Sequence, residues 1–234
     1  MVELDFSDIP LEFKELLIPI RKKQQELACK IILKNKIKLD AIRFIAGFDV
    51  GYNEKGKYAC AGVTLLDFRT LEIIEQQVEF FTPPIHYIPS FLHFRESNGY
   101  HAVFKKLEEK PDVLIFDGNG IIHPLGIGLA SQMGLELNIP SFGVAKTLLL
   151  GKYTDKLKIG GYSEIIYNNK TIGVAFQSAE PPIKPIYLSQ GHLIDLETVI
   201  NITREFCYYQ KYKTRLPLPL FLTDKLVKEK IAKS

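Results

Sequence analysis

The chain has 234 residues, of which 46% are hydrophobic and 24% charged, and its formal net charge is +3. This composition excludes a disordered chain, and because no compositional boundary divides it, we expect a single domain over residues 1–234. The apolar runs are shorter than the roughly 20 residues that span a bilayer, and the acidic N-terminus lacks the pattern of a secretory signal. We therefore expect a cytoplasmic, monomeric protein with no membrane segment.

The positive charge is concentrated near the N-terminus, where residues 14–43 hold nine Lys or Arg and three acids. A basic face of this kind can meet phosphates, but a solvated helix surface is the commoner explanation. Charge alone therefore does not predict nucleic-acid binding. The three cysteines, Cys29, Cys60 and Cys207, match no metal-ligand spacing, so we expect them to be small buried hydrophobic residues.

The first part of the chain predicts a helix followed by three strands. A helical pattern begins at Pro19 and runs to about residue 34, within an N-terminal segment (1–40) that we expect to pack on the domain. Strand-like runs follow at 43–52, 58–68 and 71–81. Because only short turns join these runs, we expect them to be antiparallel neighbours.

The rest of the chain alternates helices with strands. The apolar run "PDVLIFD" (111–117) is typical of a strand in a parallel sheet covered on both faces. The other expected elements are helices at 98–109, at 126–137 and from about Asp195, strands at 140–146, within 157–178 and before "GH", and a basic C-terminal tail at about 222–234. Three antiparallel strands followed by parallel strands predict a mixed α/β sheet with helices on both faces, as in the ribonuclease H-like layout.

Two of the expected strands end in an aspartate, "FIAGFD" in Asp49 and "DVLIFD" in Asp117. Ligands bind at the carboxyl ends of strands in open α/β sheets, so these two side chains would converge on one place. Carboxylates held that close repel each other, and a hard divalent cation such as Mg²⁺ or Mn²⁺ compensates their charge. The alternative is that each aspartate only starts a turn.

Four further ionisable residues are candidates for the same site. Glu96 is expected at the N-terminus of a helix, where an acid also interacts favourably with the helix dipole. His123 and His192 lie in glycine-rich turns and could orient a water or a phosphate, although a loop histidine is commonly a surface group. Lys146 ends "FGVAK" and could hold a phosphate or an attacking water, or it could be a strand-end lysine without a further role.

Several segments closely resemble the endonuclease V family of inosine-specific repair nucleases. They are "IAGFDVGY", "YIPSFLHFRE", "PDVLIFDGNGIIHPLGIGLASQMGLELNIPSFGVAKTLLLG" and "SQGHLIDLETV". Together with "QQELA" and "RLPLPL" they cover nearly the whole chain in the family's order. The long central block is highly specific, whereas "IAGFD" alone would be a weak signal.

The resemblance implies a ribonuclease H-like fold and a Mg²⁺-dependent DNA repair endonuclease in which Mn²⁺ can substitute. The family hydrolyses the second phosphodiester bond on the 3′ side of a deaminated adenine and leaves the damaged base in place. Carried over to this chain, Asp49, Glu96 and Asp117 would bind the metal. His123, Lys146 and His192 would assist them in the active site.

The resemblance also implies how the lesion is bound. Tyr87 in "PPIHYIPS" would be a wedge inserted where the base leaves the stack, and the flanking prolines would stiffen its loop. The glycines of "DGNG" would let the main chain approach the flipped base. The expected substrate-binding residues are Tyr87, Ile88, Pro89, Ser90, Gly118 and Gly120.

The chain departs from the family pattern at four positions. Leu125 stands where "HPR" is usual, so an arginine that could touch a phosphate is absent. Gln132 replaces a common histidine, Ser90 replaces the glycine usual after "YIP", and His86 replaces a common proline. These changes spare the acids, so we expect catalysis to survive, but affinity, lesion range and the choice between DNA and RNA stay open.

Two alternatives to a DNA endonuclease stay open at the level of sequence. One is an endoribonuclease for inosine-containing RNA, which a contact with a 2′-hydroxyl would distinguish. The other is a module that binds damaged nucleic acid without cutting it. The three acids argue against the second alternative, because binding alone does not require carboxylates clustered beside a phosphate.

Overall fold

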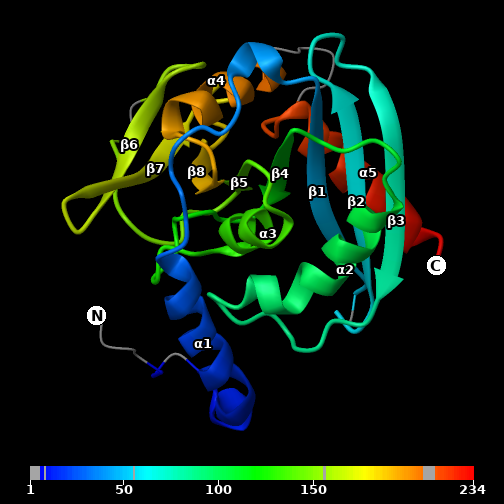
Figure 1. The fold of residues 1–234 in the computed structure, drawn as a ribbon, viewed down its shortest axis with the longest axis vertical. Coiled ribbons are helices and arrows are strands. Elements are labelled where there is room, and N and C mark those ends of the chain that lie inside the picture. The colour runs from blue at the N-terminus through cyan, green and yellow to red at the C-terminus, as the bar shows by residue number, and fades with distance from the viewer. Residues whose placement is uncertain (1–5, 8, 55, 155–156, 208–213) are drawn as a thin grey trace.

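The computed structural model describes residues 6, 7, 9–54, 56–154, 157–207 and 214–234. All strands of this part of the chain lie in one eight-stranded sheet of order β3-β2-β1-β4-β5-β8-β7-β6 (Figure 1). The strands are β1 (Phe44–Tyr52), β2 (Ala59–Asp67), β3 (Ile73–Phe81), β4 (Val113–Asp117), β5 (Ser141–Ala145), β6 (Tyr162–Tyr167), β7 (Lys170–Phe176) and β8 (Ile186–His192). The helices are α1 (Lys14–Ala28), α2 (Leu92–Lys106), α3 (Leu129–Leu137), α4 (Leu196–Cys207) and α5 (Leu218–Ala232), with short 3-10 helices at Leu11–Phe13 and Leu39–Ala41.

The pairing of the strands confirms the predicted mixed sheet. The first three strands form an antiparallel unit with β2 in the middle, and the other side of β1 pairs with β4. β1, β4 and β5 run parallel, whereas β8, β7 and β6 continue the sheet with antiparallel pairs. The carboxyl ends of β4 and β5 therefore meet at one edge, next to the second half of β1.

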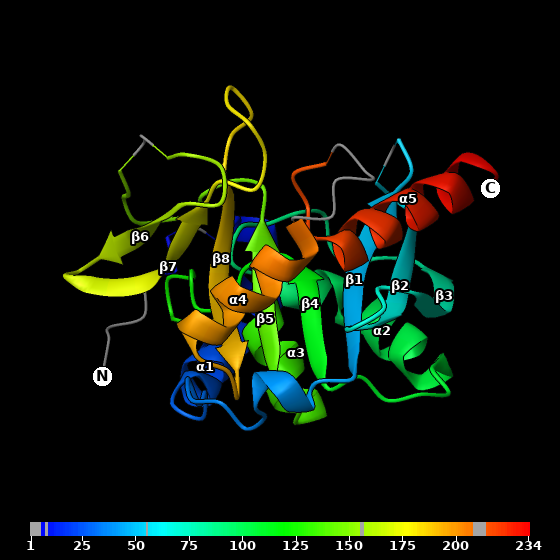
Figure 2. The same cartoon turned by 90° about the horizontal axis from the view of Figure 1, so that it is seen from above.

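Helices cover both faces of this sheet, as the apolar composition of the central strands predicts. On one face Ile45 and Ile115 pack in a buried cluster with side chains of α4 and α5. On the other face Phe48 and Phe116 pack with Tyr100 of α2 and with α3. Figure 2 shows α4 and α5 in front of the sheet. Neighbouring residues of a strand point to opposite faces, so each central strand needs apolar side chains on both.

The C-terminal segment, predicted as a basic tail at about 222–234, is instead the last part of the helix α5, which packs on β1 and β2. Two strand glycines allow its close approach. A Cβ at Gly47 would lie 2.6 Å from the backbone carbon of Pro219, and one at Gly62 would lie 2.5 Å from Val227. The Thr223 hydroxyl also donates a hydrogen bond to the Gly47 carbonyl (2.9 Å). Buried apolar side chains thus hold this segment on the sheet.

Two helices begin earlier than the sequence predicts. α1 spans Lys14–Ala28 rather than 19–34, and Pro19 lies inside it. α2 begins at Leu92 rather than at residue 98, because the proline-rich loop ends where Phe91 is fully buried. No helix of the described residues is both long and apolar enough to cross a membrane.

The cysteines follow the prediction only in part. Cys60 is buried and Cys207 is half-buried, but Cys29 is exposed because it follows directly on the last residue of α1.

Candidate active site

Asp49 and Asp117 are neighbours on adjacent parallel strands. The register pairs Phe48 with Phe116, so the two aspartates that follow them lie side by side. Asp117 ends β4, as predicted. Asp49 does not end β1, because the strand continues to Tyr52 in its antiparallel ladder with β2. The predicted convergence is therefore present, although it arises from strand register and not from two strand ends.

A lysine and a third aspartate complete this cluster. Lys146 follows the last residue of β5, and its ammonium donates a hydrogen bond to Oδ2 of Asp117. Asp224 on α5 is also close to this ammonium, with Oδ1 3.7 Å from Nζ. Lys228, one turn further along α5, contacts Oδ2 of Asp224 at 2.6 Å. Asp224 is not among the residues predicted from the sequence, because its local signal is only an acid in the apolar segment "PLFLTDKL".

Asp49 is the most buried of the three aspartates in this cluster. Its burial raises its pKa well above the usual range, and the charges of Asp117 and Asp224 raise it further, while Lys146 opposes them. One oxygen accepts a hydrogen bond from the Val50 backbone N–H (2.8 Å). The charge of Asp49 is therefore incompletely compensated by the protein, which favours a bound cation.

Glu96 lies on α2, near enough to Asp117 for the two charges to interact. It lies within the helix, not at its predicted N-terminus, and is 5% exposed. Its two oxygens accept hydrogen bonds from the hydroxyls of Tyr52 (2.5 Å) and Tyr100 (2.9 Å). Burial raises the pKa of Glu96 to about 7, with a smaller contribution from Asp117, although the tyrosine hydrogen bonds lower it.

The donor set fits a hard divalent cation. Asp49, Asp117, Glu96 and Asp224 offer carboxylate oxygens, which are the ligands that Mg²⁺ prefers in proteins. Within the described ranges, no three His, Cys, Asp or Glu side chains already lie in an arrangement that could enclose a metal ion. Lys146 forms ion pairs with both Asp117 and Asp224, so the positive charge at this position comes from the chain itself.

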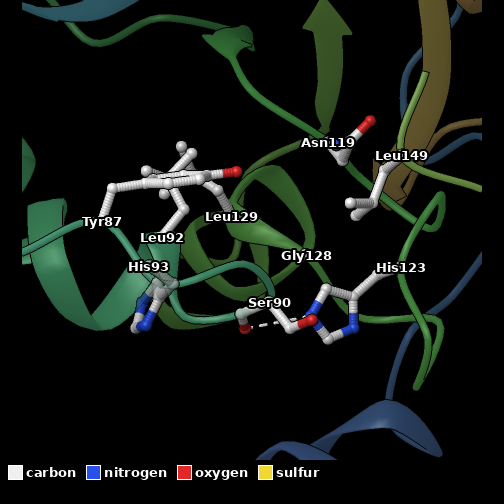
Figure 3. A pocket seen from close by; sticks show the side chains of 9 residues that line it. All are labelled: Tyr87, Ser90, Leu92, His93, Asn119, His123, Gly128, Leu129 and Leu149. Carbon is white, nitrogen blue, oxygen red and sulfur yellow. Dashed lines mark hydrogen bonds between the residues drawn. The ribbon is translucent and has the colours of Figure 1, made fainter. Parts of the chain in front are cut away.

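A pocket that opens to solvent lies beside α2 and the loop after β4 (Figure 3). Tyr87, which is 56% exposed, forms one side, and Asn119 and Leu149 lie across from it. The full lining is Tyr87, Ser90, Leu92, His93, Asn119, His123, Gly128, Leu129 and Leu149. Of the predicted substrate-binding residues, only Tyr87 and Ser90 line this pocket.

The other predicted substrate-binding residues have different surroundings. Ile88 is buried in a small apolar cluster with α1, and Pro89 is exposed. Gly118 and Gly120 allow the loop after β4 to pack tightly. A Cβ at Gly120 would lie 2.0 Å from the Gln190 carbonyl oxygen of β8, and one at Gly118 would lie 2.9 Å from Leu129.

His123 forms a wall of the pocket and is not in the acid cluster. Its Nδ1 accepts a hydrogen bond from the Leu125 N–H (3.2 Å), so Nδ1 carries no proton in this arrangement. Its Nε2 lies 3.0 Å from the Ser90 carbonyl oxygen and must donate to it. These two hydrogen bonds require a neutral ring that is protonated on Nε2. Together they fix the position of the loop after β4.

His192 does not reach the acids. It pairs with Ser141 at the start of β5, whereas Asp117 is level with Val144 near the end of that strand. Its Nδ1 accepts a hydrogen bond from the Ile32 N–H (3.3 Å), which fixes the segment after α1 on the sheet. The predicted catalytic role of His192 has no support in this geometry, because β8 runs antiparallel to β5.

Two departures from the family pattern have a structural role near the pocket. Gln132 is buried, and its Nε2 lies 3.4 Å from the Ile127 carbonyl oxygen and 3.5 Å from that of Gly128. Leu125 is half-buried, and its N–H holds the His123 ring. Both residues therefore support the loop between β4 and α3.

The pocket and the acid cluster share two elements. On α2, Leu92 lines the pocket, and the charge of Glu96, four residues later on the same face, interacts with that of Asp117. After β4, Asp117 belongs to the cluster, and Asn119, two residues later, lines the pocket. The pocket and the acid cluster are therefore fixed relative to each other by α2 and the loop after β4.

A family model for endonuclease V matches residues 25–225 of this chain. The chain belongs to the endonuclease V family. An endonuclease V of Dictyoglomus turgidum is 40% identical over 201 residues, which cover 86% of this chain and 85% of that protein. This membership makes the protein a nuclease of the deoxyribonuclease V type.

Solved structures of endonuclease V share this fold. The Bacillus subtilis endonuclease V has a TM-score of 0.84 and 32% identity, over 92% of this chain and 91% of that chain. A Ciona intestinalis endonuclease V, bound to a 24mer DNA containing an inosine followed by a ribo-adenosine, has a TM-score of 0.82 and 28% identity, over 94% and 99% of the two chains. The ribonuclease H-like prediction is thereby confirmed at the level of a mixed α/β sheet shared with these enzymes.

Proposed function

We propose that this protein is a Mg²⁺-dependent repair endonuclease that recognises inosine in DNA. It hydrolyses the second phosphodiester bond 3′ to the lesion and leaves the base in place. The observation that supports this best is that α2 and the loop after β4 carry residues of both the pocket and the acid cluster. Recognition and cleavage then occur at separate positions of one bound strand.

In this proposal Asp49, Asp117 and Glu96 hold the metal, and Asp224 lies close enough to share in binding it. A bound divalent cation would activate a water and stabilise the leaving oxygen, and Mn²⁺ would substitute for Mg²⁺. Lys146 keeps a positive charge at the end of β5. Burial alone would lower its pKa, but Asp117, Asp49 and Asp224 raise it, so the ammonium is available to offset phosphate charge.

The pocket binds the flipped hypoxanthine, with Tyr87 against the position that the base leaves. Extraction of a base costs a few kcal/mol of stacking, so a half-exposed aromatic ring at the rim can replace part of that contact. Tyr87 lies at the rim of the pocket, and more than half of its surface is exposed there.

An inosine-specific endoribonuclease is a second candidate. It is favoured by the Ciona intestinalis complex, in which a ribo-adenosine follows the inosine. A nuclease that tolerates a 2′-hydroxyl at that position can in principle accept an RNA strand.

Both candidates are tested by incubation with matched labelled DNA and RNA strands that carry a single inosine, with Mg²⁺ or with EDTA. An Asp49→Ala variant and inosine-free strands are the controls. We expect a Mg²⁺-dependent nick near inosine in DNA that Asp49→Ala abolishes. Cleavage of RNA alone would favour the second candidate, and no metal-dependent nick on either strand would refute both.

A further inference from the structure

The Ser90 carbonyl joins three segments that are distant in sequence. Its oxygen lies 2.9 Å from Nε2 of Gln24 on α1 and 3.0 Å from Nε2 of His123 in the loop after β4. A carbonyl oxygen has two lone pairs, so these two donors use its full capacity. Ser90 itself follows the Tyr87 loop, so one atom connects α1, the loop that carries the wedge and the pocket wall.

Gln24 is buried to an unusual degree for a glutamine. It is 1% exposed, and its Oε1 has no hydrogen-bond partner among the residues that the structure describes. An unpaired buried acceptor destabilises the fold, so its presence requires a compensating contribution. The only hydrogen bond of Gln24 in the described residues that bears on the pocket is the one to Ser90.

Ser90 has a backbone conformation that disfavours a side chain. Its φ is +71°, in the left-handed region where glycine is the usual residue. This conformation turns the Ser90 carbonyl toward Gln24 and His123. Without the hydrogen bonds from Gln24 and His123, Ser90 would relieve its backbone strain by relaxing to a negative φ. Its carbonyl would then turn away from these two residues.

The apolar contacts of the loop do not replace this hydrogen bond. Ile85, Ile88 and Phe91 are buried against Leu17 of α1 and hold the loop on the helix. Such contacts are not directional, so they fix the distance of the loop but not the direction of one carbonyl. Tyr87 is largely exposed, and its direction therefore depends on the backbone around it.

We propose that Gln24 is a positioning residue for lesion recognition, which fixes the Ser90 carbonyl and through it the wedge loop and the His123 wall of the pocket. This inference rests on the proposed function. It adds that α1 determines how well the enzyme distinguishes inosine from undamaged DNA, while the acid cluster determines the rate of cleavage.

The test compares Gln24→Leu, which keeps the size of the side chain and removes the donor, with Gln25→Leu, the same change at the next residue of α1. Affinities for inosine-containing and undamaged duplexes are measured in an Asp49→Asn background, so that no substrate is cut. Single-turnover cleavage at saturating enzyme is measured in the active background. Hydrogen exchange of residues 85–91 reports on the loop without any activity.

We expect Gln24→Leu to reduce the ratio of the two affinities by about fivefold, the effect of one hydrogen bond. Cleavage of the saturated complex should change by less than about twofold, residues 85–91 should exchange faster, and Gln25→Leu should behave like the wild type. Equal losses on both duplexes, or a lower cleavage rate with an unchanged ratio, would overturn the positioning role.

Two further variants keep the test decisive if Gln24→Leu does not fold. Gln24→Asn stays polar but is too short to reach Ser90, and should show the same loss of discrimination. Adding Ser90→Gly to Gln24→Leu should restore part of the ratio, because glycine adopts the positive φ without strain. No loss with Gln24→Asn and no recovery in the double variant would refute the proposal. A wild-type protein that does not distinguish inosine would instead refute the proposed function itself.

Discussion

Lys146 forms an ion pair with Asp117 across the ends of two parallel strands, β5 and β4. Asp224 of α5 forms a second, longer ion pair with the same ammonium. Carboxylates from the sheet and from α5 are thus held together by a cation that belongs to the chain. A divalent ion that binds Asp117 must share it with Lys146 or replace the lysine there.

Lys146→Met should make the stability of the protein depend more strongly on Mg²⁺. Without the ammonium, Asp117 and Asp224 repel each other, so the metal-free variant should melt several degrees below the wild type. Saturating Mg²⁺ should recover more of the melting temperature in the variant than it adds to the wild type. Thermal melts with Mg²⁺ and with EDTA check this, with Lys105→Met on the exposed side of α2 as the control. An equal response of both proteins to Mg²⁺ would contradict it.

Asp49→Asn should abolish cleavage and stabilise the metal-free fold. Burial, Asp117 and Asp224 raise the pKa of Asp49, so the native state holds its proton more tightly than the unfolded state. The stability from this group is present at low pH and is lost as the pH rises from the unfolded pKa of about 4 through the raised folded value. The amide can still accept the Val50 hydrogen bond.

For Asp49→Asn we therefore expect a melting temperature about 2–4 °C above that of the wild type at pH 8 in EDTA, which corresponds to about 1 kcal/mol. The difference should shrink at pH 4 and when Mg²⁺ binds the wild type. A variant that melts below the wild type at pH 8 would show that the protein already compensates the charge of Asp49.

Glu96 should give cleavage a pH dependence near neutrality. Burial raises its pKa to about 7, so its ionised fraction grows as the pH rises through that value. At limiting Mg²⁺ the single-turnover rate should therefore increase between pH 6 and pH 8. Tyr100→Phe removes a hydrogen bond that lowers this pKa, so the midpoint should move to higher pH. Tyr167→Phe, an exposed tyrosine of β6, is the control, and an unmoved midpoint in Tyr100→Phe would exclude Glu96 as the titrating group.

Tyr87→Ala should weaken discrimination more than cleavage. The ring lies at the rim of the pocket, so its loss removes a contact made only when a base has left the stack. We expect a lower affinity for inosine-containing DNA, by about fivefold to tenfold, and little change for undamaged DNA, consistent with one stacking contact. Tyr162→Ala, an exposed tyrosine on β6, is the matched control. An equal loss on both DNAs would assign Tyr87 to general binding.

The parts of the site that could be predicted from sequence are those with a local cause. The apolar runs before Asp49 and Asp117 specify buried central strands, and the parallel register then brings the two acids together. Lys146 lies near them because it directly follows β5, the parallel neighbour of β4. The predicted start of α2 is wrong. The proline-rich segment does not show from sequence alone that Phe91 is buried and ends the loop.

The remaining errors come from contacts between distant segments. The family resemblance predicts His192 in the site, and its glycine-rich turn makes it a candidate, but the antiparallel direction of β8 places it at the other end of β5. Asp224 was missed because it meets Lys146 only after α5 packs on β1, through close contacts at Gly47 and Gly62. No local pattern in the last 20 or so residues encodes that packing.

The position of the nick tests the central claim most directly, because the pocket and the acid cluster are fixed on common elements. A duplex with one inosine, labelled at the 5′ end of the inosine strand, is cut with Mg²⁺, and the product is sized to single-nucleotide resolution. The account predicts one product that ends at the second phosphodiester bond 3′ to an intact inosine, and no product with Asp49→Asn. Cuts scattered along the strand, or removal of the base itself, would contradict it.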